Sequence, residues 1–264
     1  MRSMMSEPMS ETAHHAQSRG QTGLVNSPFY GLVSLDFLVR GEDHPCPYLP
    51  ENTAREEVFG AVDFPPELYH DFMNHGFRRS GMYFYRPVCE ACCECRPIRI
   101  LAGEYRLAKS HRRILRKNRD VDVRIGSPKL TKDKIRIYSD YLASQHDCGP
   151  DHSADSLGSF LYKSPVRTLE FEYRLRRRLV AVGIVDICSR SLSSVYAFFD
   201  PDFSSISLGT FSAIQELLFC QEHKIPHYYL GFLVADCPSM NYKARFTPHE
   251  ILDKSFRWVC RELA

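Results

Sequence analysis

The chain has 264 residues, which suits one large domain or two modest ones, and 44% of them are hydrophobic, enough for a buried core. No run of about 18 apolar residues is present and the N-terminus has no apolar leader, so we expect a cytoplasmic protein with no membrane partner. The formal net charge is +2, but basic residues are concentrated at 105–119 and 174–178. Such blocks are either solvated faces or local anion-binding surfaces.

In chain order, residues 1–26 are rich in Ser, Met, Gln, His and Gly, which predicts a disordered tail. Three prolines in residues 43–50 predict a loop. A helix is predicted over residues 66–76, with Pro65 and Pro66 at its start and Gly76 as its C-cap. The next predicted elements are a hairpin over 77–88, a cysteine loop over 89–95, a strand over 96–103 and a helix over 108–118 with Ser110 as candidate N-cap.

The second half begins with a short predicted strand over 121–125. A helix is predicted over 131–145, where Ile135, Tyr138 and Leu142 recur at helical spacing. From residue 168 the pattern changes to strands over 168–175, 179–187 and 193–200, a helix over 209–223 and a buried strand over 227–234. This order predicts the α+β class, with helices packed on a mainly antiparallel sheet.

The densest cluster of reactive side chains is the cysteine loop, which contains Cys89, Cys92, Cys93 and Cys95. In a cytoplasmic chain this spacing favours metal or redox chemistry over disulfides. Thiolates so spaced can bind zinc or an Fe–S cluster, and Cys46 can supply a ligand from a distant loop. The alternative is a thiol-rich loop without a metal, and the spacing alone leaves both open.

A second cluster lies on the predicted helix over 108–118. Arg112, Arg116 and Arg119 fall near one face, and Arg113 and Lys117 form a neighbouring row. Such rows match the phosphates of an RNA backbone, although ordinary solubility also explains them. Nearby aromatic residues that can stack on exposed bases are Tyr83, Phe84, Tyr85 and Tyr105.

A third cluster follows the strand over 227–234, where an irregular polar segment contains Tyr242 and Lys243. These side chains can bind a phosphate or a ribose, or hold a carbonyl. The chain has no Ser–His–Asp, Walker or dinucleotide-binding fingerprint, which disfavours hydrolases of that type, ATPases and dehydrogenases.

Taken in order, the motifs resemble those of the bacterial aspartate/glutamate leucyltransferases, which are related to the eukaryotic arginyl-tRNA–protein transferases. The resemblance spans roughly residues 30–250. It rests on CPYLP at 46–50, Ala54-Arg55, GFRRSG at 76–81, YRP at 85–87, the cysteine loop with PIRI, HRRILRKN at 111–118, LVAVGIVD, SSVYAFFDPD, SLGT, YYLGFLV and CPSMNYKARFTP.

The resemblance implies an acetyltransferase-like (GNAT) domain over 121–264 and a smaller N-terminal domain over 27–120. It implies transfer of an aminoacyl group from tRNA to proteins that begin with Asp or Glu, which marks them for degradation. The group is leucine, from leucyl-tRNA, in the bacterial branch and arginine in the eukaryotic branch. The expected partners are therefore an aminoacyl-tRNA and an acceptor protein, and the transfer itself requires no cofactor.

The sequence departs from the family pattern at two places. Eukaryotic relatives bind an Fe–S cluster or zinc through a C-x-x-C pair and an adjacent Cys-Cys. Here Cys46 and the Cys92-Cys93 pair match three positions, but Leu49 stands at the fourth, so that Cys89 or Cys95 would have to substitute. A segment expected to read Arg-His-x-Asp-Gly reads QHDCG at residues 145–149.

The acidic side chain of the acceptor needs an arginine pocket, because Arg binds carboxylates bidentately. Neighbouring strand residues point to opposite faces, so one of the adjacent arginines can enter a pocket. The candidates for the acceptor site are Arg78, Arg79 and Arg86. Those for tRNA contacts are Arg112, Arg113, Arg116 and Lys117. Those for catalysis are Tyr242, Lys243 and His146, with His146 and Asp200 considered as general base.

Two other interpretations compete with an aminoacyltransferase. A non-catalytic RNA- or metal-binding module would use the cysteine loop and the basic helix but leaves the second half of the chain unexplained. A small-molecule N-acetyltransferase needs a glycine-rich pyrophosphate loop, and SISLGTFSAIQ at 205–215 has a single glycine.

Overall fold

The computed structural model describes residues 38–145 and 153–261, so the expected tail over 1–26 lies outside the described residues. Its helices are α1 (Pro66–Asn74), α2 (Lys109–Lys117), α3 (Lys132–Gln145), α4 (Ala154–Leu157) and α5 (Leu208–Glu222), with the shorter turns η3 (Gly158–Tyr162), η4 (Pro201–Ile206) and η5 (Asn241–Arg245). Within the described residues, no helix is long and apolar enough to cross a membrane.

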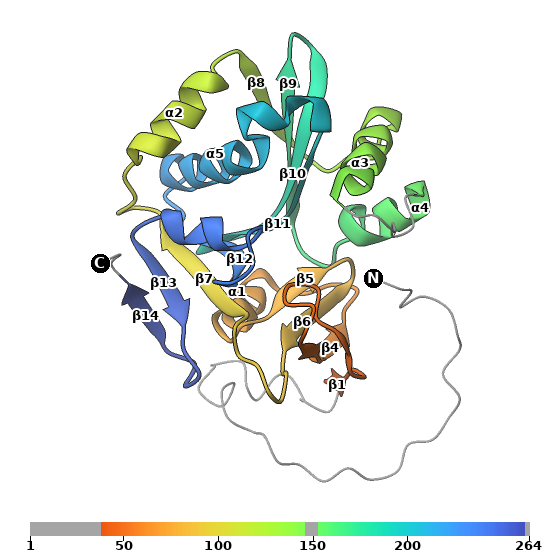
Figure 1. Ribbon diagram of the computed structural model, residues 1–264, viewed down its shortest axis with the longest axis vertical. Coiled ribbons are helices and arrows are strands. Elements are labelled where there is room, and N and C mark those ends of the chain that lie inside the picture. The colour runs from red at the N-terminus through yellow and green to blue at the C-terminus, as the bar shows by residue number, and fades with distance from the viewer. Residues whose placement is uncertain (1–37, 146–152, 262–264) are drawn as a thin grey trace.

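The strands form one small and one large sheet, with helices around the large one (Figure 1). The four-stranded sheet contains, in spatial order, β1 (Val39–Arg40), β4 (Glu56–Gly60), β6 (Tyr83–Pro87) and β5 (Arg78–Ser80). The eight-stranded sheet contains, in spatial order, β14 (Trp258–Arg261), β13 (His249–Leu252), β7 (Arg96–Leu101), β12 (His227–Leu233), β11 (Ser191–Phe199), β10 (Arg178–Cys188), β9 (Thr168–Leu175) and β8 (Val121–Gly126). A separate pair joins β2 (His44–Pro45) and β3 (Thr53–Ala54).

The small sheet packs against α1 through a cluster of phenylalanines. The Phe59 ring stacks on Phe84 at 5.0 Å between centroids, and Phe72 and Phe77 meet its other sides at 5.1 and 5.8 Å. The predicted helix is confirmed from its first residue, Pro66, but it ends at Asn74 and its C-cap is His75. Gly76 follows the cap with φ +87°, a conformation that suits glycine. The predicted hairpin over 77–88 is confirmed as β5–β6.

The centre of the large sheet is buried on both faces. Most positions of β10 are buried, because α5 covers one face and α3 the other (Figure 1). Ile214 and Leu217 of α5 belong to one core cluster, whereas Ile137 and Leu142 of α3 belong to a second one. The predicted α+β class is confirmed, since all pairings in this sheet except β11–β12 are antiparallel.

Strand β7 lies in the middle of the large sheet, between β12 and β13. Chain from both sides of residue 120 therefore builds this one sheet. Neither β13 nor β14 was predicted from the sequence pattern. The helix predicted over 108–118 is confirmed as α2, but its N-cap is Ala108, which makes no side-chain capping bond, so the assignment of Ser110 as N-cap is wrong.

The single parallel pairing in the sheet is short. It joins Ser191–Ser193 of β11 to His227–Tyr229 of β12, and no further pairs follow, although both strands continue. On its other side, β12 shifts register against β7 between Tyr229 and Phe232. Gly231 lies inside this shift with φ +89°, where a residue with Cβ would be strained. The backbone of β12 beyond Tyr229 is thus free of β11 and available to side chains.

Candidate active site

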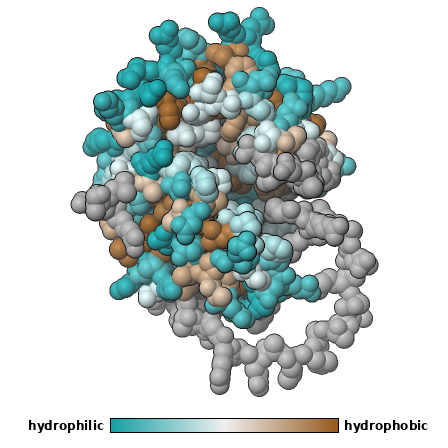
Figure 2. Space-filling model, viewed as in Figure 1, coloured by the Kyte–Doolittle hydropathy of each residue, from teal (hydrophilic) through white to brown (hydrophobic). Residues whose placement is uncertain are grey.

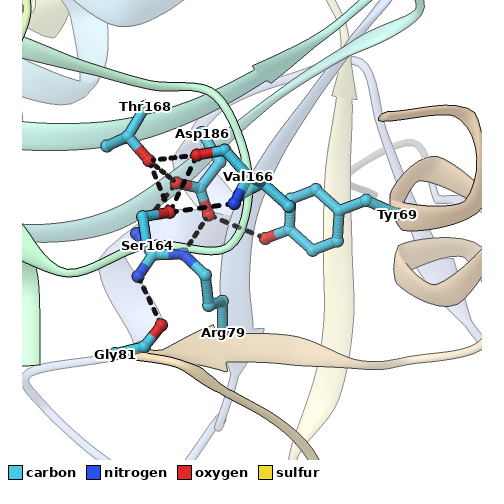
Figure 3. Close-up of polar contacts among 7 residues, drawn as sticks. All are labelled: Tyr69, Arg79, Gly81, Ser164, Val166, Thr168 and Asp186. Carbon is cyan, nitrogen blue, oxygen red and sulfur yellow. Dashed lines mark hydrogen bonds and ion pairs between the residues drawn. The ribbon is translucent and has the colours of Figure 1, made fainter. Parts of the chain in front are cut away.

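The two adjacent arginines of β5 have different surroundings, although each is only 4% exposed. Arg79 forms a bidentate ion pair with Asp186 of β10, at 2.7 Å from Nε and 2.8 Å from Nη2, and Nη1 donates to the Gly81 carbonyl. Tyr69 and Thr168 also donate to the Asp186 carboxylate (Figure 3). All the groups of Arg79 are thus engaged within the protein, where they join the small sheet to the large one.

Arg78 has no such partner. Its Nη2 donates to the Gly231 carbonyl at 2.9 Å, but Nε and Nη1 are buried without a hydrogen-bond acceptor, and none of the ion pairs among the described residues involves Arg78. The guanidinium carbon lies 5.2 Å from the Tyr229 ring centre and 5.8 Å from that of Phe232. Burial lowers the Arg78 pKa. A buried cation with two unsatisfied donors is suited to an anion.

Lys243 lies beside this guanidinium. It is 7% exposed, and its Nζ donates to the Phe232 carbonyl at 2.8 Å, one residue along β12 from the carbonyl that Arg78 binds. Burial, followed by the charge of Arg78, lowers the Lys243 pKa to about 7. A Cβ on Gly231 would lie 3.3 Å from this Nζ, so the glycine also makes room for the amine.

Tyr242, which directly precedes Lys243, lies within electrostatic reach of a buried carboxyl, that of Glu216. Glu216 of α5 accepts hydrogen bonds from Tyr228 at 2.7 Å and from Ser212 at 2.8 Å, and burial raises its pKa to about 7. Burial, and then the charge of Glu216, raises the Tyr242 pKa, so this phenol stays protonated and can donate. We did not single out Glu216 from the sequence; its signal was one acid within the apolar run FSAIQELLFC.

Arg86, the third candidate for the acceptor site, is already paired. Its Nε and Nη2 both donate to one oxygen of Glu57, at 2.9 and 2.8 Å, and Arg40 binds the other oxygen. The guanidinium carbon also lies 4.8 Å from the centre of the Phe77 ring. The structure therefore does not bring the three arginines together as one clamp. His146 lies outside the described residues, and Asp200 is bound by Arg178 at 2.6 Å and caps η4.

All four candidate tRNA contacts are exposed on α2. Arg112 donates to the Leu107 carbonyl at 2.6 Å and Lys117 to the Ser205 carbonyl at 3.2 Å, so these two are partly engaged with backbone. Arg113 and Arg116 have no acid partner among the described residues. The opposite face of α2 holds buried His111, so the basic side faces solvent.

Four cysteines gather where the cysteine loop meets the loop of Cys46. Burial raises the Cys95 pKa to about 12, and the neighbouring thiols of Cys46, Cys89 and Cys92 add to that effect. Cys93 is exposed and is not among these neighbours. Soft thiol donors suit zinc or iron, but across residues 38–145 and 153–261 no three Cys, His, Asp or Glu side chains are arranged as ligands of one ion. The four thiols gather there without the geometry of a metal site.

Comparison with known proteins places the chain in a family. The family described as "Arginine-tRNA-protein transferase, N terminus" matches residues 44–113, and the one described as "Arginine-tRNA-protein transferase, C terminus" matches residues 133–253. These two regions cover more than half of the chain. The chain belongs to the arginine-tRNA-protein transferase family, and it is an aminoacyltransferase.

Several bacterial relatives carry one name, "Aspartate/glutamate leucyltransferase". The protein from Campylobacter jejuni strain RM1221 is 34% identical over 212 residues, which are 78% of this chain and 89% of that protein. The protein from Marinobacter nauticus is also 34% identical, over 79% of this chain and 90% of its own. The protein from Pseudomonas putida strain F1 is 34% identical over 222 residues, 83% of this chain and 94% of its own.

Proposed function

We propose that this chain transfers leucine from leucyl-tRNA to the N-terminal α-amine of proteins that begin with Asp or Glu, marking them for degradation. The names of its relatives support this donor and these acceptors. The observation that carries the proposal is Arg78, a buried cation with two unsatisfied donors next to Lys243. An acceptor that begins with an acidic residue presents a carboxylate close to its reactive amine, and such a site can hold that carboxylate.

The large sheet supports an acetyltransferase-like arrangement for the C-terminal half. Strands β9, β10 and β11 form an antiparallel meander, α5 crosses over, and β12 returns parallel to β11 for three residue pairs before pairing ends. Arg78 and Lys243 line β12 just beyond that point. The acyl ester is proposed to enter where the two strands part.

The chemistry requires positioning more than activation, because an aminoacyl ester is already reactive. The acceptor amine has an ordinary pKa of about 7.7–8.0, so much of it is neutral near pH 8. The amine nitrogen attacks the ester carbonyl, the bond to the ribose oxygen breaks, and the amine proton passes to that oxygen. Arg78 holds the acceptor carboxylate, and the protonated phenol of Tyr242 is proposed to donate to the aminoacyl carbonyl. No cofactor enters these steps.

Lys243 is proposed to couple acceptor binding to a proton. Its pKa of about 7 leaves the amine mostly neutral at pH 8. A carboxylate placed between Lys243 and Arg78 favours the charged amine, so an acidic acceptor is bound with uptake of a proton. On the donor side, the exposed row of α2, made of Arg112, Arg113, Arg116 and Lys117, is proposed to contact tRNA phosphates.

The test is transfer of labelled amino acid to peptides that differ only in the first residue. Leucyl-tRNA and arginyl-tRNA are compared as donors, with Asp-, Glu-, Asn- and Ala-starting peptides as acceptors. We expect labelling of the Asp and Glu peptides from leucyl-tRNA alone. Labelling from arginyl-tRNA and none from leucyl-tRNA would overturn the donor, and equal labelling of the Asn and Asp peptides would overturn the role of the carboxylate.

A further inference from the structure

The turn between β9 and β10 consists of two arginines, which is unusual for a turn with this backbone conformation. Leu175 pairs with Arg178, so Arg176 and Arg177 alone make the turn. Both have positive φ, 49° and 73°. Two-residue hairpin turns of this kind favour Asn-Gly, because both positions have positive φ, which glycine adopts freely and Asn tolerates better than most residues. Residues held in such unfavourable backbone conformations cluster at functional sites, so the two arginines are candidates for a binding role.

The charges around the turn show which arginines are available. Arg174 pairs with Glu172 at 2.9 Å, and Arg178 pairs with Asp200 at 2.6 Å. Arg176 and Arg177 are exposed, and none of the hydrogen bonds or ion pairs among the described residues involves either side chain. The nearby acids thus neutralise the flanking arginines, whereas the two at the tip keep their full charge.

The turn lies beside the C-terminal end of α2, although about 60 residues separate them in sequence. Strand β8 begins right after α2, and its first residue, Val121, pairs with Leu175, which directly precedes the turn. The short helix η4 joins the same elements, since Lys117 donates to the Ser205 carbonyl and Arg178 binds Asp200 at the start of η4. In Figure 1 the tip of the β9–β10 hairpin and the end of α2 project at the same end of the molecule, and in Figure 2 that end carries many hydrophilic residues.

We propose that Arg176 and Arg177 extend the basic surface of α2 and bind phosphates of the tRNA backbone. The site rests on the proposed function, which supplies the tRNA. Guanidinium groups bind phosphates bidentately, and a rigid two-residue turn holds them in place with little loss of entropy. The turn adds two cations next to the end of α2, so the two elements together offer a polyanion a longer basic surface than α2 alone.

The decisive variant is R176N/R177G, which installs the residue pair that this turn favours. If the arginines served the fold, the change would lower stability; we expect the melting temperature to stay or rise, because Asn and Gly tolerate positive φ. Affinity for leucyl-tRNA should fall about tenfold at about 0.1 M salt. The slope of log K against log salt should fall by about 1.4 to 1.8, given about 0.7–0.9 for each of two phosphate contacts.

Two controls separate charge from geometry. R176K/R177K keeps both charges and should bind leucyl-tRNA within about threefold of wild type, with an unchanged salt slope. R190N removes a charge from the turn at the other end of β10, between Cys188 and Ser191, and should leave tRNA affinity unchanged. In transfer to an Asp-starting peptide, R176N/R177G should raise KM for leucyl-tRNA more than it lowers kcat, because the proposed contact is with the tRNA backbone.

If the unmodified protein binds leucyl-tRNA, and R176N/R177G binds it with the same affinity and the same salt slope, the role of the turn is overturned. The proposed function then still stands. A wild-type protein that neither binds nor uses leucyl-tRNA would overturn both. A variant that binds tRNA normally but loses transfer to a folded acceptor protein, while keeping transfer to a peptide, would assign the turn to a protein partner and refute this proposal.

Discussion

Arg78 and Arg79 are neighbours on one strand, yet the partners within reach of each give them opposite roles. Because side chains alternate along β5, Arg79 reaches Asp186 whereas Arg78 reaches the free carbonyl of Gly231. A buried ion pair holds the protein together, and a buried unpaired cation is retained at a cost in stability. Of the three candidate arginines, Arg78 has neither an ion-pair partner nor acceptors for Nε and Nη1, which is why we propose it, and not Arg79 or Arg86, for acceptor binding.

Substitution of each arginine by Ala should therefore separate binding from stability. R79A leaves Asp186 buried without its cation, and we expect it to lower the free energy of unfolding by roughly 3–5 kcal/mol in urea titrations. R78A should raise KM for Asp- and Glu-starting peptides about 30-fold or more, roughly 2 kcal/mol, with tRNA affinity unchanged. The assignment fails if R78A leaves peptide KM unchanged and affects only unfolding.

Glu216 should make stability fall as pH rises. Its pKa is about 7 in the folded protein and near 4.5 when unfolded, so between these values the folded state holds a proton that the unfolded state releases. This contribution is complete below pH 4.5 and lost as pH passes 7, with a size on the order of 3 kcal/mol. Relative to wild type, E216Q should be least stable near pH 4.5 and should gain stability steadily through about pH 8 in urea titrations. Parallel pH curves for the two proteins would contradict this.

At the scale of elements, α2 should set the salt dependence of tRNA binding. R112A/R113A/R116A removes three exposed cations, and we expect the slope of log K against log salt to fall by about 2 to 3. The matched control is K132A/K163A/R167A, which removes the same charge from exposed sites on other elements. Filter binding between 50 and 300 mM salt measures both, and equal slopes for the two triple variants would refute a specific role of α2.

Two thiols of the cysteine loop, those of Cys93 and Cys95, should react with a disulfide reagent at different rates. Cys93 is exposed, whereas Cys95 is half-buried with a pKa of about 12, and only the thiolate attacks a disulfide reagent. In a thiol-exchange assay at pH 8, we expect C93S to remove a fast phase and C95S to leave the fast phases intact.

Iron, zinc and sulfide in anaerobically purified protein should be substoichiometric. One metal or cluster per chain would show instead that the gathered thiols rearrange to hold it.

Local patterns predicted the elements well but not their partners. Prolines and periodicity located α1, α2 and α3, and strand-length apolar runs located β9 to β12. Which of two adjacent arginines is unpaired depends on Asp186, more than a hundred residues away, and no local pattern encodes that contact. Strands β13 and β14, at one end of the large sheet, were missed because each has only four residues. The N-cap was misplaced because α2 begins without a side-chain cap.

At the scale of the molecule, the two halves share a sheet, so a cut at residue 120 should disrupt it. A fragment of residues 121–264 lacks β7, and the neighbours β12 and β13 then lose their common partner. A fragment of residues 96–264 keeps that strand. We expect cooperative thermal unfolding by circular dichroism for the longer fragment and none for the shorter. A cooperative transition in the shorter fragment would show that the C-terminal half folds independently of β7.

The position of β7 also has a consequence for how the chain is made. The strand leaves the ribosome early, ending at Leu101, whereas its two neighbours begin at His227 and His249. During most of synthesis, both of its edges are unpaired and its apolar residues Ile98 and Ile100 lack the core that later buries them. Completion of the sheet waits for the last part of the chain, which is a slow, non-local event. Nascent chains should therefore depend on chaperones until translation ends.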